Sequence, residues 1–340
     1  MKSRRNIAAV TCGVILAFIL SFYPLPYYIT KPGMAQDLSP IIKVEGGYEE
    51  EGNLMLTTVS MAKATPLAYA LARVQDFQEI YPVQDIRQEG ENDEEYTYRQ
   101  LNMMETSKES AILIAYKHAG KKVEIKNHGV YILGIIPNMP AEERLQVGDR
   151  VYKVDGKNIE TSEEFVEYVT NKKLGDKVKI EFQRDGSNQA AELKVAPFPQ
   201  FKNKVGLGIT LVTDREVKVK PDIKIDTEKI GGPSAGLMFS LEIYNQLTKE
   251  DLTRGYEIAG TGTIDDEGRV GPIGGISQKI AAAANSGAEI FFAPNENGAK
   301  GSNYREALAT AKKIDTDMKI VPVDTFEEAV NYLKSLKEKK

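Results

Sequence analysis

Two residues of this chain, Ser234 and Lys279, have types and surroundings that could perform chemistry together. Ser234 lies in a Gly-Gly-Pro-Ser-Ala-Gly segment, and Lys279 follows a glycine pair and precedes an alanine-rich run. A serine hydroxyl is an effective nucleophile only beside a base, and a lysine serves as that base when its ammonium loses a proton easily. Burial and the positive end of a helix both favour that loss. We therefore interpret the pair as nucleophile and general base for peptide-bond hydrolysis.

Two helix starts are expected to position this pair. Pro233 suits the first helical position because it lacks an amide hydrogen, which would place Ser234 in the first helical turn. Backbone N–H groups there have no intrahelical partner, so they could hold an oxyanion. The loop residues are Gly232, Pro233, Ala235 and Gly236. Taken singly, the serine could be a helix cap and the lysine a solvated helix residue, but their joint occurrence with the surrounding glycines favours catalysis.

The motifs around the pair resemble the proteolytic domain of the Lon family. That domain carries its Ser/Lys dyad in a Gly-Pro-Ser-Ala-Gly segment and a later Pro-Ile-Gly-Gly-x-x-x-Lys segment, which here is 272–279. Thr261 falls on a family threonine near the dyad, and the resemblance implies that it orients the lysine. Segments 287–294 and 320–323 are similar to the closing strands of that domain. The resemblance covers the whole C-terminal portion of the chain.

The sequence departs from Lon proteases in two respects. Lon proteases have an acidic residue two positions before the motif proline, where this chain has Gly231. The chain also contains no Gly-x-x-x-x-Gly-Lys-Ser/Thr phosphate loop, the motif by which an ATPase cradles its nucleotide. We therefore expect an ATP-independent protease whose substrates are already extended.

Residues 121–199 resemble a bacterial PDZ domain, through Gly129 to Ile132, Gln146 to Val151 and the Asp155-Gly156 turn. Such domains bind a peptide as an added edge strand beside a helix. The candidates for that edge are Val130, Tyr131 and Ile132. An alternative is that the domain only packs against the protease and binds nothing, because a fold alone does not establish a function.

The segments around the PDZ-like region indicate a protease domain split in sequence. Residues 43–120 contain a strand-like run and a helix-like run, and the helix-like run resembles the first helix of a Lon proteolytic domain. We assign 43–120 to the first part of the protease domain and 200–340 to the second, with the alternative that 43–120 is an independent small α/β unit. Segment 206–209 resembles a terminal-carboxylate loop, but we favour a strand that returns the chain to the protease.

The N-terminus has the pattern of a membrane segment. Lys2, Arg4 and Arg5 precede a nearly apolar stretch whose length is near the short end for a spanning helix, and basic residues on one side orient the remainder outward. We expect a cytoplasmic tail at 1–6, a single transmembrane helix at 7–28 and a linker at 29–42, with a cleaved signal peptide as the alternative. The only cysteine, Cys12, lies in this stretch, which fits an extracytoplasmic catalytic domain.

Composition narrows the function further. The 340 residues are 41% hydrophobic, which is typical of folded domains. The net charge of −5 does not indicate a basic surface for binding nucleic acid. The two histidines, His118 and His128, do not form a metalloprotease motif. We therefore expect no metal and no other cofactor.

Together these observations predict an α+β chain with a Lon-type proteolytic domain, an inserted β-rich PDZ domain and one N-terminal transmembrane helix. The expected function is that of a membrane-anchored serine endopeptidase, similar to PDZ-containing Lon-like proteases of Gram-positive bacteria, which cleaves extracytoplasmic peptides or protein segments selected by the PDZ domain. The expected partners are a peptide or protein substrate and the membrane. The family resemblance also implies a possible homo-oligomeric ring. The alternative is a PDZ-based surface adaptor in which the protease-like domain is a scaffold.

Overall fold

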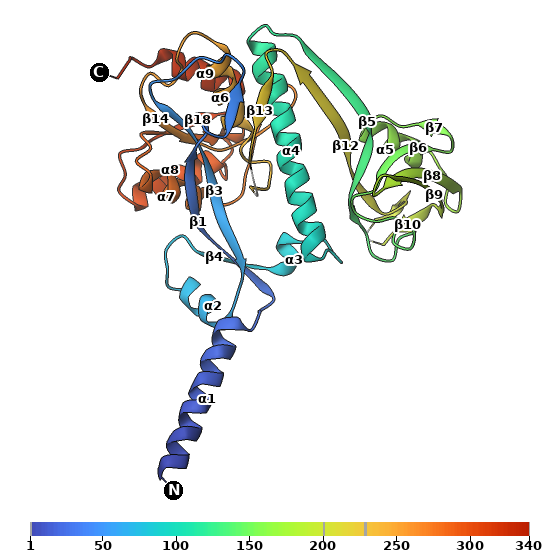
Figure 1. Ribbon diagram of the computed structural model, residues 1–340, viewed down its shortest axis with the longest axis horizontal. Helices are drawn as coiled ribbons and strands as arrows, with labels where there is room; N and C mark the ends of the chain where they lie inside the picture. Colours follow the sequence, from blue (N-terminus) through green and yellow to red (C-terminus); the bar gives the residue numbers. More distant parts are fainter. Residues whose placement is uncertain (1, 200, 228–229, 340) are drawn as a thin grey trace.

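The chain consists of three parts (Figure 1). These are an α/β body, a β-rich module on a two-stranded arm and a projecting N-terminal helix. The computed structural model describes residues 2–199, 201–227 and 230–339, and the side chains of 2–5, 8, 9 and 201–203 lie outside that description. The architecture is therefore mixed α and β, as the sequence predicts.

The body is built on one mixed six-stranded sheet. Its order is β18 (Lys319–Val323), β17 (Ile290–Pro294), β14 (Glu257–Gly260), β3 (Asn53–Lys63), β1 (Tyr27–Asp37) and β4 (Glu79–Pro82). The first four strands are parallel, whereas β1 runs antiparallel to both β3 and β4. The prediction of a linker at 29–42 is wrong, because β1 is a full member of the sheet.

Alternating side chains along the strands bury both faces of the sheet. Leu54 and Leu56 of β3 pack against one layer, while Met55 packs against the other. The first layer contains α4 (Asp93–His118), α6 (Gly236–Leu247) and α9 (Phe326–Ser335). The second contains α7 (Ile276–Asn285) and α8 (Asn303–Lys313). The residue pair proposed for chemistry comes from opposite layers of this sandwich.

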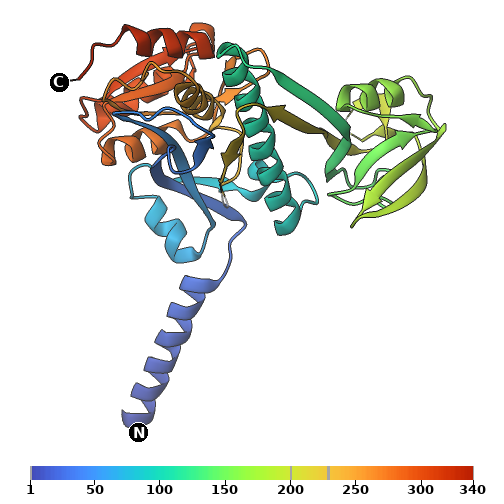
Figure 2. The ribbon, with the colours of Figure 1, turned by 45° about the horizontal axis from the view of Figure 1, so that its top comes forward.

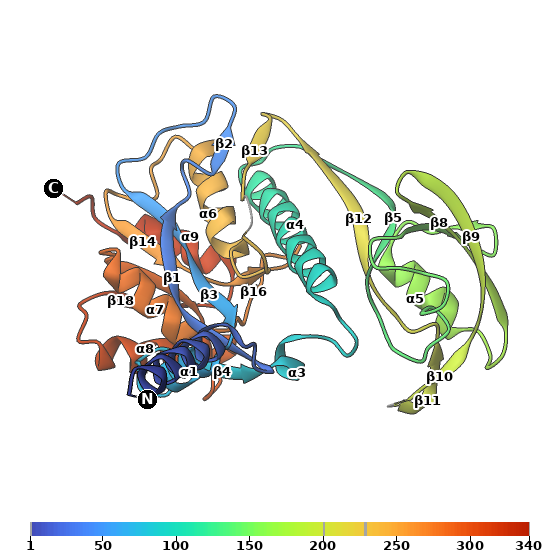
Figure 3. The ribbon, with the colours of Figure 1, turned by 60° about the horizontal axis from the view of Figure 1, so that its bottom comes forward.

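The long helix α4 separates the body from the β-rich module (Figure 3). Asn92 caps its N-terminus in a reciprocal capping box with Glu95, an arrangement that satisfies donors which a helix start leaves unpaired. Ser107 and Ser110 are both 4% exposed on this helix. The helix therefore offers two buried hydroxyls to neighbouring loops.

Short elements complete the body. These are α2 (Pro66–Ala72), α3 (Val83–Ile86), the pair β2 (Ile42–Val44) and β13 (Ile223–Ile225), the hairpin of β15 (Thr263–Ile264) and β16 (Val270–Gly271), and a 3₁₀ turn at Glu296–Gly298. The hairpin directly follows β14, so it lies near the C-terminal end of that parallel strand.

The β-rich module has its own sheet and core. Its sheet order is β12 (Ile209–Val219), β5 (Val123–Ile135), β6 (Arg150–Val154), β8 (Lys177–Arg184) and β9 (Ser187–Lys194), with β7 (Lys157–Asn158) paired to β6. Helix α5 (Ser162–Thr170) packs on this sheet, and β10 (Ala196–Phe198) pairs with β11 (Phe201–Gly206). The module therefore extends past the predicted end at 199, because β12 belongs to its sheet.

The arm is the shared length of β5 and β12, which pair from Ile209↔Ile135 to Val219↔Val123. One end of this ribbon lies in the module and the other lies beside α4, as Figure 2 also shows. Both crossings between body and module are thus made by paired strands rather than by single loops.

Helix α1 (Lys2–Phe22) projects away from the body (Figure 1). It ends before the predicted boundary at 28, because Tyr27 and Tyr28 already belong to β1. Within the described part of the chain, no helix combines the length and apolarity that a membrane crossing requires.

Candidate active site

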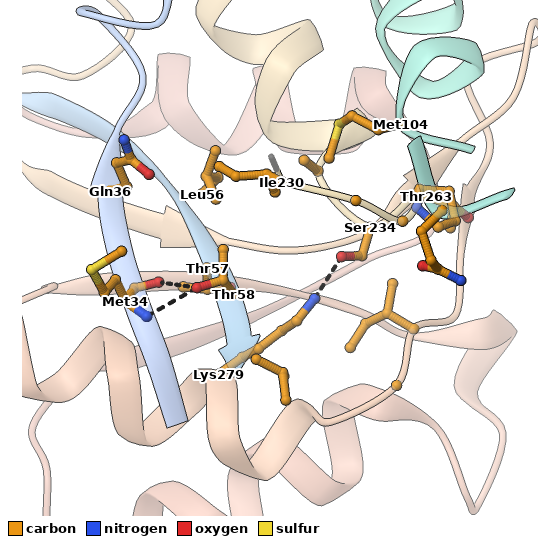
Figure 4. Close-up of a pocket in the computed structure, with 18 of the residues that line it drawn as sticks. Met34, Gln36, Leu56, Thr57, Thr58, Met104, Ile230, Ser234, Thr263 and Lys279 are labelled. Atoms are coloured by element: carbon orange, nitrogen blue, oxygen red, sulfur yellow. Dashed lines mark hydrogen bonds between the residues drawn. The ribbon is translucent and has the colours of Figure 1, made fainter. Parts of the chain in front are cut away.

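Ser234 and Lys279, 45 residues apart in sequence, meet in the body with Lys279 Nζ 2.7 Å from Ser234 Oγ (Figure 4). Lys279 is the fourth residue of α7, and Ser234 lies in the turn before α6. The separation is that of a hydrogen bond. The structure therefore brings together the two residues that the sequence pairs.

Thr261 fixes the orientation of the lysine amine. Its hydroxyl donates to the carbonyl oxygen of Ser234 at 3.0 Å, and Lys279 Nζ lies 2.8 Å from Thr261 Oγ1. Because the single hydroxyl proton is committed to that carbonyl, Thr261 can only accept from the amine. One N–H of Lys279 therefore donates to Thr261, and the rest of the Nζ group remains available to interact with Ser234.

Burial changes the acid–base character of Lys279. The residue is 3% exposed, and burial lowers the pKa of its ammonium from 10.5 to about 7. Desolvation penalises the charged form of a lysine, so the neutral amine is substantially populated at neutral pH. A neutral amine has the free electron pair that a general base needs.

The backbone around Ser234 differs in one detail from the sequence prediction. Helix α6 begins at Gly236 with Ala235 as its N-cap, so Pro233 and Ser234 precede the helix instead of opening it. In addition to the bond from Thr261, Ser107 Oγ donates to the Pro233 carbonyl at 3.0 Å, and the Gly262 N–H donates to the Ser234 carbonyl at 2.9 Å, so this turn is held from several sides.

Few backbone N–H groups of the loop around Ser234 are free to donate to an oxyanion. Pro233 has no N–H, the Gly232 N–H donates to the Gln100 carbonyl at 2.9 Å, and the Gly236 N–H donates to the Pro233 carbonyl at 3.5 Å. Within the described residues, the N–H groups of Ser234 and Ala235 have no acceptor. Of the four predicted loop residues, Ala235 alone therefore offers a free donor, together with Ser234 itself.

Two glycines allow the close packing of the site. A Cβ on Gly236 would lie 2.8 Å from Ile264 Cγ2 and 2.9 Å from Ser107 Oγ. Gly275 caps α7 in the left-handed region at φ 69°, where a side chain is strained. A Cβ there would also lie 2.7 Å from Val59 Cγ2. Gly236 and Gly275 therefore bring the helices that carry Ser234 and Lys279 close to their neighbours.

A cavity of about 730 Å³ opens over the pair (Figure 4). The strands contribute Met34, Leu56 and Thr58, and α4 contributes Gln100 and Met104. This volume lies within the range of pockets that enclose small ligands, and its apolar lining would accept an apolar side chain of a peptide. These residues could not be predicted from the sequence as lining the site, because β1, β3 and α4 lie far from Ser234 and Lys279 in the chain.

Gly231, where Lon proteases have an acidic residue, packs against α4. A Cβ at this position would lie 2.9 Å from the Cβ of Gln100. A larger side chain would therefore require the two segments to separate. The approach of α4 gives a structural reason for glycine at this departure from the family motif.

The predicted peptide edge at Val130, Tyr131 and Ile132 is wrong. These residues lie in β5, where β12 pairs along one side and β6 pairs with Val130 and Tyr131 on the other. Val130 and Ile132 are also fully buried. An interior strand has no free edge on which a peptide could add.

The edge strands of this sheet are β12 and β9, and β12 is the edge beside β5. Among the described residues, β12 pairs only with β5, and it lies beside α5. It is preceded by a turn in which the N–H groups of Leu207 and Gly208 have no described acceptor. The segment 206–209 is therefore a turn leading into a strand, which combines both interpretations of the sequence.

The described residues contain no group of three or more histidine, cysteine, aspartate or glutamate side chains placed to hold a metal.

Two family models match the chain in the regions where these features lie. Residues 102–195 match the PDZ domain, and residues 212–335 match the Lon protease (S16) C-terminal proteolytic domain. The chain thus contains a PDZ domain and a Lon-type proteolytic domain. The site pair and Thr261 all fall within the second match.

Two curated relatives are Lon proteases. The chain is 33% identical to a Lon protease of Metamycoplasma arthritidis over 108 residues, 32% of this chain and 12% of the relative. It is 36% identical to Lon protease 2 of Bacillus subtilis over 102 residues, 30% of this chain and 16% of the relative. The chain therefore matches only a small part of the length of these proteins.

Two solved structures are each similar to about a quarter of the chain. One is the PDZ domain of an SdrC-like protein of Listeria monocytogenes, with 36% identity, coverage of 25% of this chain and 88% of that chain, and a TM-score of 0.24. The other is a solution structure from Geobacillus thermodenitrificans, with 49% identity, coverage of 24% and 94%, and a TM-score of 0.22.

Substitution of Gly236 by alanine should destabilise the protein, because the added Cβ meets Ile264 and Ser107. Overpacking of this kind costs about 1–3 kcal/mol, measurable from the midpoint of urea unfolding. Gly274→Ala is the matched control, since a Cβ there meets nothing within 4 Å. Equal stability of the two variants would contradict the tight packing described for the turn.

Proposed function

We propose that the protein is an ATP-independent serine endopeptidase in which Ser234 is the nucleophile and Lys279 the general base. The observation that carries the proposal is the 2.7 Å contact between Ser234 Oγ and a buried lysine amine whose pKa is about 7. The match of residues 212–335 to the Lon proteolytic domain supports the same reaction class.

The geometry supports a complete acyl-transfer cycle. Neutral Lys279 accepts the proton of Ser234 as Oγ attacks the peptide carbonyl, and the N–H groups of Ser234 and Ala235 donate to the developing oxyanion. The Lys279 ammonium then gives its proton to the leaving amine, which leaves an acyl-enzyme on Ser234. Water, deprotonated by Lys279, releases the second product and restores the free serine.

Loss of either member of the pair should abolish hydrolysis. Ser234→Ala and Lys279→Ala should each lower kcat by about 10⁴-fold or more, because neither group acts without the other. The measurement is cleavage of a quenched peptide library by the full chain in detergent, without ATP and with a chelator present. Lys312→Ala, which changes an exposed lysine, is the control, and normal turnover by Lys279→Ala would refute the proposed base.

The pH dependence follows from the direction of the lysine shift. Lys279 acts only as the neutral amine, so kcat/KM should rise about tenfold per pH unit below about pH 7 and level off above it. Because the pKa of Lys279 is lowered to about 7, its amine is already mostly neutral above that pH. A limb centred near 10.5, the ordinary lysine value, would mean that burial does not tune this group.

We also propose that the PDZ domain selects substrates through the β12 edge beside α5. Added strands bind such edges through main-chain hydrogen bonds, and the turn at Leu207 and Gly208 offers free N–H groups to a terminal carboxylate. The function of the PDZ domain is therefore assigned to β12 and not to β5.

Gly208→Ala should weaken peptide capture by this edge. Gly208 has φ 83°, and its Cβ would lie 2.1 Å from Met139 Cβ, so the turn must rearrange. The measurement is retention of library peptides by immobilised full chain carrying Ser234→Ala. Gly186→Ala has similar strain at φ 75° but no neighbour within 4 Å, and equal retention by both variants would count against this edge.

We further propose that α1 anchors the protein in a membrane, with the catalytic body on the outer side. Val10, Val14, Phe18 and Phe22 of α1 are each more than 60% exposed, and a contiguous set of exposed apolar side chains favours a lipid environment. The full chain should float with lipid vesicles, whereas a chain beginning at Pro24 should not. Flotation of both would place the lipid contact elsewhere.

A further inference from the structure

The strand pairing of the arm between the two domains is interrupted at two levels, and the second lies next to Arg215. The pairing of β12 with β5 shifts register between Thr213 and Arg215, and on β5 the partners jump from Val130 to Asn127. Gly129, within that jump, has φ 116°. Register breaks of this kind bend and twist a ribbon, so the arm has a defined hinge level.

Arg215, immediately beyond the interruption, ties the arm to the proteolytic body. Its guanidinium donates to Glu109 Oε2 at 3.1 Å, to Asp266 Oδ2 at 2.6 Å and to Ser110 Oγ at 3.1 Å. The Arg215 side chain is 12% exposed and that of Glu109 is 15% exposed. One side chain therefore connects the arm to both α4 and the β15–β16 turn.

The contact between Arg215 and Glu109 is largely desolvated. Burial raises the pKa of Glu109 to about 7, even though the adjacent Arg215 lowers it. Removal of one partner of a buried pair leaves the other charge uncompensated. The docked arrangement of arm and body therefore depends on the arginine being present.

The partners of Arg215 lie on the same two elements, α4 and the β15–β16 hairpin, as residues that contact the loop of Ser234. Ser110 Oγ donates to Asp266 Oδ1 at 2.8 Å, and one helical turn earlier Ser107 Oγ donates to the Pro233 carbonyl at 3.0 Å. The β15–β16 hairpin that carries Asp266 also contains Ile264, which packs against Gly236. Each of the two elements that contact the nucleophile turn thus also carries a partner of Arg215.

A cavity of about 630 Å³ adjoins this cluster. Its lining includes residues Leu211 to Thr213 of β12 and the start of α5. It also includes Glu109 and Asp266, two partners of Arg215. An occupant of the β12 edge that reached this end would lie against the partners of Arg215. The cluster is therefore placed to respond to what the PDZ domain holds.

We propose that Arg215 is a positioning residue that couples the placement of the PDZ domain to the Ser234 turn. Energetic coupling between sites requires an element whose arrangement both sites bias, and the hinge with its Arg215 contacts is that element. The proposal rests on the proposed proteolytic function for its kinetic consequence, but the placement of the domain can be measured without proteolysis.

The experiment uses the full chain in detergent, with Cys12→Ser and spin labels at Lys157→Cys in the PDZ domain and Lys312→Cys in the body, both exposed. Arg215→Ala should broaden the label–label distance distribution about twofold and lower kcat on a quenched peptide about tenfold, with little change in KM. Arg215→Lys should restore part of both. Arg269→Ala is the control, because the described ion pairs of the Arg269 side chain are with Asp265 and Glu267 of its own hairpin turn and do not reach the arm.

Each other result overturns part of the proposal. An unchanged distance distribution in Arg215→Ala would show that the arginine does not hold the domain. A broadened distribution with unchanged kcat, or with a change in KM alone, would show that placement is not coupled to the nucleophile. A wild-type chain that cleaves no peptide would refute the proposed function, while the distance measurement would still decide whether Arg215 holds the domain.

Discussion

The burial of one lysine amine is the constraint on which the site depends. Lys279 is almost fully removed from solvent, and the resulting fall of its pKa from 10.5 to about 7 corresponds to roughly 5 kcal/mol of preference against the charged form. A surface lysine at the same distance from Ser234 would remain protonated and could not accept a proton. The hydroxyl of Thr261 supplies the polar contact that the buried amine requires.

The sandwich architecture creates this environment. Ser234 precedes a helix of one layer and Lys279 belongs to a helix of the other, so the two can meet only where the sheet between them ends. Thr261 follows the last residue of β14 and lies at that end. The parallel strands therefore determine where the site lies, and glycines 236 and 275 set how closely the two helices approach it.

The sequence was sufficient to single out Ser234, Lys279 and Thr261, which the structure brings together, because each lies in a short local motif. The sequence was insufficient where the structure depends on pairing between strands that lie far apart in the chain. The β1 segment contains Pro32 and Gly33 and reads locally as a linker, yet it pairs with β3 across the whole sheet. The peptide edge was misplaced for the same reason: only the return of β12, some 80 residues later in the chain, covers β5. The role of Arg215 was also invisible, since its three partners come from two distant segments.

The most direct test of the account is the titration of Lys279 itself, followed by NMR of the full chain with isotope-labelled lysine and assigned with Lys279→Arg. The account predicts one lysine resonance that titrates near pH 7 and is missing from the variant. Titration of Lys279 near its ordinary value of 10.5 would contradict the claim that burial makes this lysine the general base.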